Sequence, residues 1–168
     1  MNTQTQPNAG LEKIKTMVEP IRIAMLTTTD EHGHLTSRPM ACLQVDEEGA
    51  FWFFTKKTSP KVAQVNHQSP QVNLSFSNPA DSDYVSISGT AEELDDRIKI
   101  DELWSDMAKA WFPKGKDDPE LTLLKVSTEM AEYWDSNDSK LVRLFQIARA
   151  AVSGDTYQDG GNHAKVTL

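Results

Sequence analysis

Apolar residues alternate with polar ones at a spacing of two along much of the chain, which is the pattern of half-buried β-strands. The segments with this pattern, or with a short apolar run, are 21–28, 35–45, 50–55, 71–77, 84–92 and 121–133. Acidic, glycine-containing turns at 30–33 and 46–49 separate the first three, which is typical of antiparallel hairpins. The pattern therefore predicts six strands in a mainly antiparallel sheet.

Other segments show the spacing or the end signals of helices. They are 11–18, which ends at Pro20; a short helix that begins at Pro60; 95–111, with Asp95 as its N-cap; and a closing helix over 141–151. Residues 1–10 are polar and predict a flexible lead, whereas 11–168 form one predicted domain with an extended tail from 155.

The order of these elements indicates a fold class. Strands follow one another, with helices inserted only between some of them, so a doubly wound parallel sheet is disfavoured. A mainly β fold with helices, in which the sheet closes into a small barrel, is favoured.

Composition narrows the class of protein. The chain has 168 residues, 38% of them hydrophobic, which suits one globular domain. No apolar run reaches the ~18 residues of a membrane-spanning helix, and the N-terminus lacks a secretory signal. A net charge of −8 argues against nucleic acid and anionic membranes as partners. The single cysteine, Cys42, is predicted to be a small core residue and fits a cytoplasmic protein.

Cations gather against this acidic background. The run 53–61, F-F-T-K-K-T-S-P-K, contains three of the 17 cationic residues. A strand ends at Thr55, and Ser59 or Thr58 followed by Pro60 marks a helix N-terminus, which is the unfavourable end for cations. A bound phosphate, held by hydroxyls, backbone N–H groups and one or two lysines, resolves the conflict. A solvated helix whose lysines point away is the alternative.

A second candidate lies in the segment T-S-R-P-M at 36–40. Proline inside a strand is confined to edges and bulges, so backbone pairing is expected to be interrupted near Pro39. If the segments 35–45 and 50–55 pair through the turn at 46–49, Arg38 and Thr55 lie at the same end of a hairpin. Arg38 then reaches the same anion; a surface arginine is the alternative. No nucleophile, acid, base or metal-ligand motif stands out, so no catalytic residue and no metal site is assigned.

Five short motifs carry a resemblance to a known family. They are T-S-R-P-M at 36–40, W-F-F-T-x-x-T-S-P-K at 52–61, S-G-T-A at 88–91, W-F-P-x-G at 111–115 with Asp118-Pro119 after it, and E-Y-W at 132–134. In this order they resemble the pyridoxamine 5′-phosphate oxidase-like FMN-binding split barrels, and most closely the bacterial general stress protein 26 branch. The resemblance spans residues 11–168.

The resemblance implies a six-stranded antiparallel split β-barrel with flanking helices, in a homodimer with FMN between the subunits. It implies cofactor-binding roles for Arg38, Pro39, Met40, Ala41, Phe54, Thr55, Ser59, Lys61, Tyr84 and Trp134. Ser59 and Lys61 match positions that hold the phosphate, and Trp134 matches a tryptophan that packs on the flavin from the partner subunit. The stretches that begin at Arg38 and Phe54 are expected to lie along the flavin.

Two departures from the oxidase proper bear on function. Pro60 stands where the oxidase often has a second cation, and the tail 160–165 lacks the Arg-x-His pattern that engages the vitamin substrate. The resemblance therefore implies an FMN-dependent oxidoreductase with a stress-related role and an unknown substrate. The alternatives are a non-catalytic flavin-binding or redox-sensing stress protein, and a split barrel that binds haem or a deazaflavin.

Overall fold

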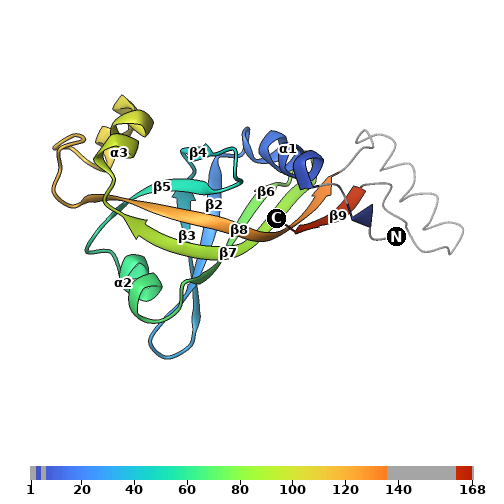
Figure 1. The fold of residues 1–168 in the computed structure, drawn as a ribbon, viewed down its shortest axis with the longest axis horizontal. Helices are drawn as coiled ribbons and strands as arrows, with labels where there is room; N and C mark the ends of the chain where they lie inside the picture. Colours follow the sequence, from blue (N-terminus) through green and yellow to red (C-terminus); the bar gives the residue numbers. More distant parts are fainter. Residues whose placement is uncertain (1–2, 5–6, 136–161, 168) are drawn as a thin grey trace, which may run out of the picture.

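The computed structural model describes residues 3–4, 7–135 and 162–167, which form one curved sheet with helices against it (Figure 1). The strands are β1 (Thr3–Gln4), β2 (Ile23–Thr29), β3 (Leu35–Ala41), β4 (Gln44–Val45), β5 (Phe51–Lys56), β6 (Gln71–Asn78), β7 (Asp83–Leu94), β8 (Leu121–Asp135) and β9 (Asn162–Thr167). The helices are α1 (Pro7–Val18), α2 (Pro60–His67), α3 (Arg97–Leu103) and the 3-10 helix η1 (Asp106–Ala110). None of the described helices is long and apolar enough to cross a membrane.

The strand pairing leads around from β3 and back to the chain segment that directly follows it. Antiparallel ladders lead from β3 through β2, β6, β7 and β8 to β5. β5 then pairs with β4, which follows β3 after only Cys42 and Leu43. The six predicted strands therefore all form and close a small barrel, as the alternating pattern indicated.

The prediction of one continuous strand over 35–45 is wrong, because the segment divides into β3 and β4 with Cys42 and Leu43 between them. The N–H of Cys42 donates to the Arg22 carbonyl oxygen at 2.8 Å, whereas the N–H of Leu43 donates to the Trp52 carbonyl oxygen at 2.8 Å. These two consecutive N–H groups thus bond to different neighbours, first to the residue that precedes β2 and then to a residue of β5. The chain therefore changes its pairing partner between Cys42 and Leu43. The expected hairpin through the turn at 46–49 is correspondingly short, because only Gln44 and Val45 pair with β5. Pro39 lies in β3, at the edge of the ladder path, as expected of a strand proline. The expected interruption of pairing near Pro39 is wrong, because the register of β3 with β2 runs without a shift from Leu35 to Ala41.

Two apolar cores lie on the two faces of the sheet. The larger is inside the barrel and is lined by Leu26, Phe51, Phe53, Leu74, Phe76, Ile87, Leu124 and Val126. α1 closes it with Ile14, Met17 and Val18, and α2 adds Val65. The smaller core lies on the other face of β5 and β8, where Ile100 of α3 and Phe112 pack on Trp52, Leu121 and Leu123.

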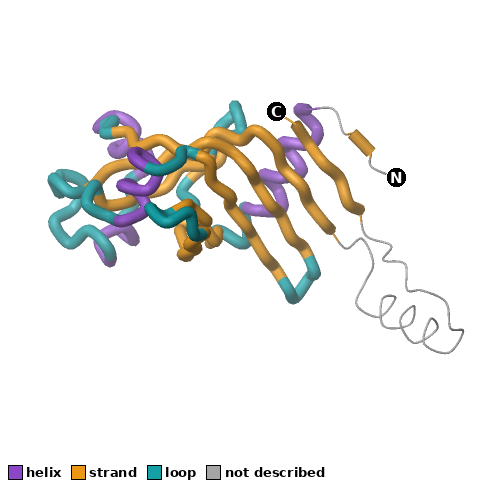
Figure 2. Tube along the Cα trace, turned by 90° about the horizontal axis from the view of Figure 1, so that it is seen from below, coloured by secondary structure: helices purple, strands orange, loops and turns teal. Residues whose placement is uncertain are grey.

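Strand β8 is shared by several neighbours. β7 pairs along one edge of it, while residues 121–126 of the other edge pair with β5 and residues 130–135 pair with β9. β1 adds to β9 in parallel. Figure 2 shows the result from below, with the barrel on one side and the longer strands extending away from it. The predicted closing helix over 141–151 lies outside the described residues, and part of the predicted tail is β9.

The helix bounds also differ from the prediction. α1 begins at Pro7, so its first residues and β1 fall inside the segment predicted as a lead. The stretch 95–111 divides into α3 and η1. Its N-cap is Asp96, whose carboxylate accepts the N–H of Lys99 at 3.0 Å, and not Asp95, which pairs with Lys57 instead.

A β-bulge explains the glycine of the S-G-T-A motif. The register between β7 and β8 shifts between Ser88, opposite Met130, and Gly89, opposite Thr128. A Cβ atom at Gly89 would lie 2.0 Å from the carbonyl oxygen of Ser127. No side chain fits there without displacing the backbone of β8.

We therefore expect Gly89→Ala to lower the free energy of unfolding by at least about 2 kcal/mol, because the methyl group forces the longest ladder apart. Urea unfolding followed by circular dichroism measures the change. Thr90→Ala, one position along the same strand, serves as control and should cost less than about 1 kcal/mol. Equal unfolding midpoints for the two variants would show that the bulge tolerates a side chain.

Candidate functional site

Arg38 is the centre of a polar cluster at one end of the barrel. Its Nη1 donates to the carbonyl oxygen of Leu26 at 3.3 Å and to Oγ1 of Thr28 at 2.5 Å. Its Nη2 donates to Oγ1 of Thr36 at 2.8 Å and to Oε1 of Gln64 at 3.1 Å. Three elements, β2, β3 and α2, therefore fix the guanidinium, and every one of its acceptors is neutral.

Lys61, in the first turn of α2, is the second cation of the cluster. Burial lowers the pKa of the Lys61 ammonium, and the charge of Arg38 lowers it further. Burial also lowers the pKa of Arg38. Among the described residues neither side chain has an ion-pair partner, although many other lysines do. Two half-buried cations thus repel each other, an arrangement that suits a bound anion.

The start of α2 supplies uncharged donors beside these cations. Ser59 is the N-cap residue with an extended backbone, but its side chain does not cap the helix. Its hydroxyl lies 3.2 Å from that of the buried Thr55. The hydroxyl of Thr58 instead donates to Glu120 at 2.8 Å and points away. The hydroxyls of Thr55 and Ser59 and the positive end of α2 therefore remain available to an anion.

Only one of the three clustered lysines takes part. Lys57 donates to Asp95 at 2.6 Å, and Lys56 is exposed. Of the one or two lysines expected to take part, the structure places Lys61 beside Arg38. The sequence could not show which lysine is paired elsewhere, because Asp95 lies 38 positions away from Lys57.

The other predicted residues of β3 and β5 face in different directions. Met40 is buried in the barrel core, whereas Pro39 and Ala41 are exposed on the outer face. The ring of Phe54 lies in the smaller core, 5.7 Å from that of Trp104. Any contact that Phe54 makes with a ligand at the Arg38 end must therefore come from its backbone. The roles of these four residues stay predictions.

Tyr84 and Trp134 belong to an aromatic row on the outer face of the sheet. Tyr84 of β7 lies opposite Trp134 of β8, which lies opposite His163 of β9. The Trp134 and His163 rings stack with centroids 4.9 Å apart and planes 6° apart. Tyr84 and Trp134 keep 40% and 39% of their surface exposed. His163 was not predicted; the only signal for it is the alternation within the extended tail.

These two groups do not meet within one chain. Arg38 stands in register with Leu26, Leu74 and Ile87, whose buried side chains share its face of the sheet. The aromatic row occupies the opposite face. The structure therefore brings Arg38, Thr55, Ser59 and Lys61 together, and leaves Tyr84 and Trp134 apart from them.

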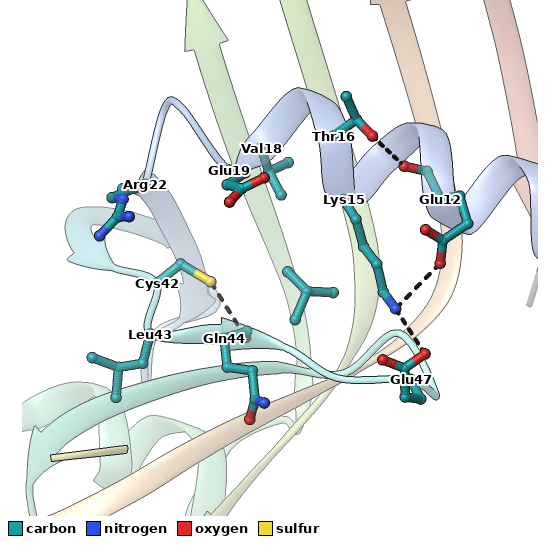
Figure 3. Close-up of a pocket in the computed structure, with 11 residues that line it drawn as sticks. Glu12, Lys15, Thr16, Val18, Glu19, Arg22, Cys42, Leu43, Gln44 and Glu47 are labelled. Atoms are coloured by element: carbon teal, nitrogen blue, oxygen red, sulfur yellow. Dashed lines mark hydrogen bonds and ion pairs between the residues drawn. The ribbon is translucent and has the colours of Figure 1, made fainter. Parts of the chain in front are cut away.

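A pocket of about 540 Å³ lies elsewhere, between α1 and residues 42–47 (Figure 3). Lys15 of α1 reaches across it to Glu47 at 3.3 Å and also pairs with Glu12 of its own helix at 3.4 Å (Figure 3). Burial raises the pKa of the Cys42 thiol at its edge to about 12, although hydrogen bonds to the backbone oppose this shift. None of the ten predicted cofactor residues lines this pocket.

A family model described as "Pyridoxamine 5′-phosphate oxidase like" matches residues 10–158. The solved structure of a putative general stress protein 26 from Jannaschia sp. CCS1 is 30% identical, covers 95% of this chain and 99% of its own, and has a TM-score of 0.74. A general stress FMN/FAD binding protein from Xanthomonas citri is 34% identical, with 77% and 90% coverage and a TM-score of 0.65. Protein bli-3 of Neurospora crassa is 24% identical over 163 residues, covering 92% of this chain and 78% of its own.

The repulsion between Lys61 and Arg38 has a measurable consequence for stability. Because folding lowers the pKa of Lys61, its charged form destabilises the folded state below that pKa, and the penalty disappears as the pH rises towards the unfolded value. Lys61→Met should therefore leave the urea midpoint of the ligand-free protein unchanged or raise it at pH 7. Lys57→Met, which removes the ion pair with Asp95, is the matched control and should not raise the midpoint. A clear fall for Lys61→Met would mean that Lys61 has a stabilising partner.

Proposed function

Because the chain belongs to the pyridoxamine 5′-phosphate oxidase-like family, we propose that it is a flavoprotein that binds FMN, with the phosphate at Arg38 and Lys61. The observation that carries this proposal is the uncompensated pair of half-buried cations in a chain with a net charge of −8. The hydroxyls of Thr55 and Ser59 and the N-terminus of α2 fit the same phosphate. The names of similar proteins, which include an FMN/FAD binding protein, support a flavin.

Phosphate contacts alone do not hold such a ligand. A hydrogen bond to a charged group contributes about 1.5–3 kcal/mol, whereas association costs about 4–15 kcal/mol. Burial of the flavin ring must supply the difference. In one chain the exposed rings of Tyr84 and Trp134 lie on the face of the sheet opposite Arg38, so they cannot cover a flavin whose phosphate is bound there.

The aromatic cover of the flavin must then come from a second copy of the chain, and we propose a homodimer. The outer face of the sheet exposes Ile23, Met25 and Leu35 by 49%, 42% and 75%, together with Tyr84 and Trp134. Small residues such as Ser37 and Ala41 lie between them. An apolar face of this kind is typical of a protein interface, and a second copy seated on it would bury these exposed side chains.

When bound, FMN would supply the redox chemistry by accepting and releasing electrons at its ring. The described side chains around Arg38 are hydroxyls, an amide and cations, which bind and orient a phosphate ester. We propose a cytoplasmic oxidoreductase with a stress-related role, because the similar solved structures are named general stress proteins. The alternative is a flavin carrier or redox sensor without turnover. Steady-state oxidation of reduced nicotinamides by the FMN-loaded protein separates turnover from storage.

The visible spectrum of the purified protein, before and after addition of FMN and desalting, tests the cofactor. We expect about one FMN for each wild-type chain. The double variant Arg38→Ala with Lys61→Ala should bind FMN at least about 100-fold more weakly, because it loses two charge-assisted contacts. Lys56→Ala, which removes an exposed cation from the same run, should keep wild-type affinity. A double variant with unchanged affinity would overturn the phosphate site, and a wild-type chain without flavin affinity would overturn the function.

The dimer is tested separately by light scattering after size-exclusion chromatography. Met25→Asp places a charge in the centre of the proposed interface and should give a monomer that retains its circular dichroism spectrum. Met107→Asp makes the same change on η1, where the side chain is 77% exposed, and should leave the dimer intact. If wild-type protein is itself monomeric at micromolar concentration, the proposed site between subunits is wrong.

A further inference from the structure

Gln64 is the side chain that joins α2 to the guanidinium of Arg38. Its Oε1 accepts from Nη2 of Arg38 at 3.1 Å and from the hydroxyl of Thr28 at 2.6 Å. The Thr28 hydroxyl in turn accepts from Nη1 of Arg38. Each group in this triangle has one consistent role as donor or acceptor, so the orientation of the amide is determined by its neighbours.

The network holds Arg38 in place without neutralising it. Its four acceptors are a backbone carbonyl, two hydroxyls and an amide oxygen. A carboxylate at position 64 would make the same hydrogen bond and would also remove the net charge of the cation. Elsewhere in the described chain, cations do form ion pairs with carboxylates. Lys57, close to the start of α2, and Arg97 of α3 both pair with Asp95.

The residue type at position 64 therefore determines whether Arg38 keeps its net positive charge. A phosphate monoester carries about −1.5 to −2 charges near pH 7 and is attracted to an unneutralised arginine–lysine pair. An additional carboxylate would satisfy Arg38 internally and repel the phosphate. This effect falls on the phosphate end of a flavin and leaves the ring end untouched.

We propose that the neutral amide of Gln64 determines the selectivity of this site for a phosphorylated flavin over an unphosphorylated one, because it positions Arg38 while leaving its charge free. This inference rests on the proposed function. Gln64 acts through Arg38 and is a positioning residue for the phosphate.

The experiment compares FMN with riboflavin, which has the same ring but no phosphate, by titration of flavin fluorescence. For Gln64→Glu the dissociation constant for FMN should rise on the order of 10- to 100-fold, while that for riboflavin stays the same. Gln64→Met keeps the size and neutrality of the side chain without its acceptor, and should keep most of the wild-type preference for FMN, because Arg38 retains its charge and three of its four acceptors. Gln68→Glu, the same chemical change at an exposed position four residues further on, should change neither constant.

The outcomes distinguish this inference from the function on which it rests. If the wild-type protein prefers FMN and Gln64→Glu keeps that preference, the role of Gln64 is refuted while the flavin site stands. If Gln64→Met loses the preference as completely as Gln64→Glu, hydrogen bonding rather than charge sets it, and the inference again fails. A wild-type protein that binds neither flavin overturns both the inference and the proposed function. Loss of folding in Gln64→Glu is detected by circular dichroism, and Thr36→Asp then places a carboxylate against the same Nη2 of Arg38, with both cations kept and the same expected loss of preference.

Discussion

Strand β8 pairs with neighbouring strands along both of its edges, and its side chains contribute to both apolar cores. β7 runs along one edge from Leu94 to Tyr84, while β5 and β9 divide the other. Because neighbouring side chains alternate between faces, the same strand presents Val126 to the barrel interior and Leu123 to the core under α3. Its far end carries Trp134 outward. The bulge at Gly89 shifts the register of β7 with β8 by one residue, so that Val126 before it and Ala131 after it both face the barrel interior.

Arg38 and Lys61 contrast with the rest of the charge distribution. The chain has 25 acidic and 17 basic residues, so carboxylates are abundant. Even so, within the described residues Arg38 meets only hydroxyls, an amide and a backbone carbonyl, and Lys61 has no ion-pair partner. Natural sequences keep local conflicts of this kind mainly where function requires them. The position of this conflict, beside a helix N-terminus, supports the proposal that an anion such as a phosphate binds there.

Structural features that depend on the local sequence pattern could be predicted. Features that depend on contacts between residues far apart in the sequence could not. The period-two pattern located the six barrel strands, and Pro60 marked the start of α2. Pro39 indicated an edge strand. The neighbours that hold Arg38, however, come from three elements, and their residue types, two threonines and a glutamine, carry no signal of their own. The turn at Cys42 and Leu43 depends on which neighbour each backbone N–H meets, and β9 pairs with β8 across the stretch 136–161. The resemblance supplied Tyr84 and Trp134, but only the structure showed that they face away from Arg38.

The environment of Cys42 determines how this molecule can respond to oxidants. Peroxides and disulfides react with the thiolate, and a thiol whose pKa is raised to about 12 is almost entirely protonated in a cell. Cys42 is the sole cysteine of the chain, so this chain has no second thiol with which to form an internal disulfide. Under the proposed function, the bound flavin rather than Cys42 is therefore the group that takes up and releases electrons. Its electron load is reset by reoxidation of the flavin, without the reductases that repair oxidised cysteines.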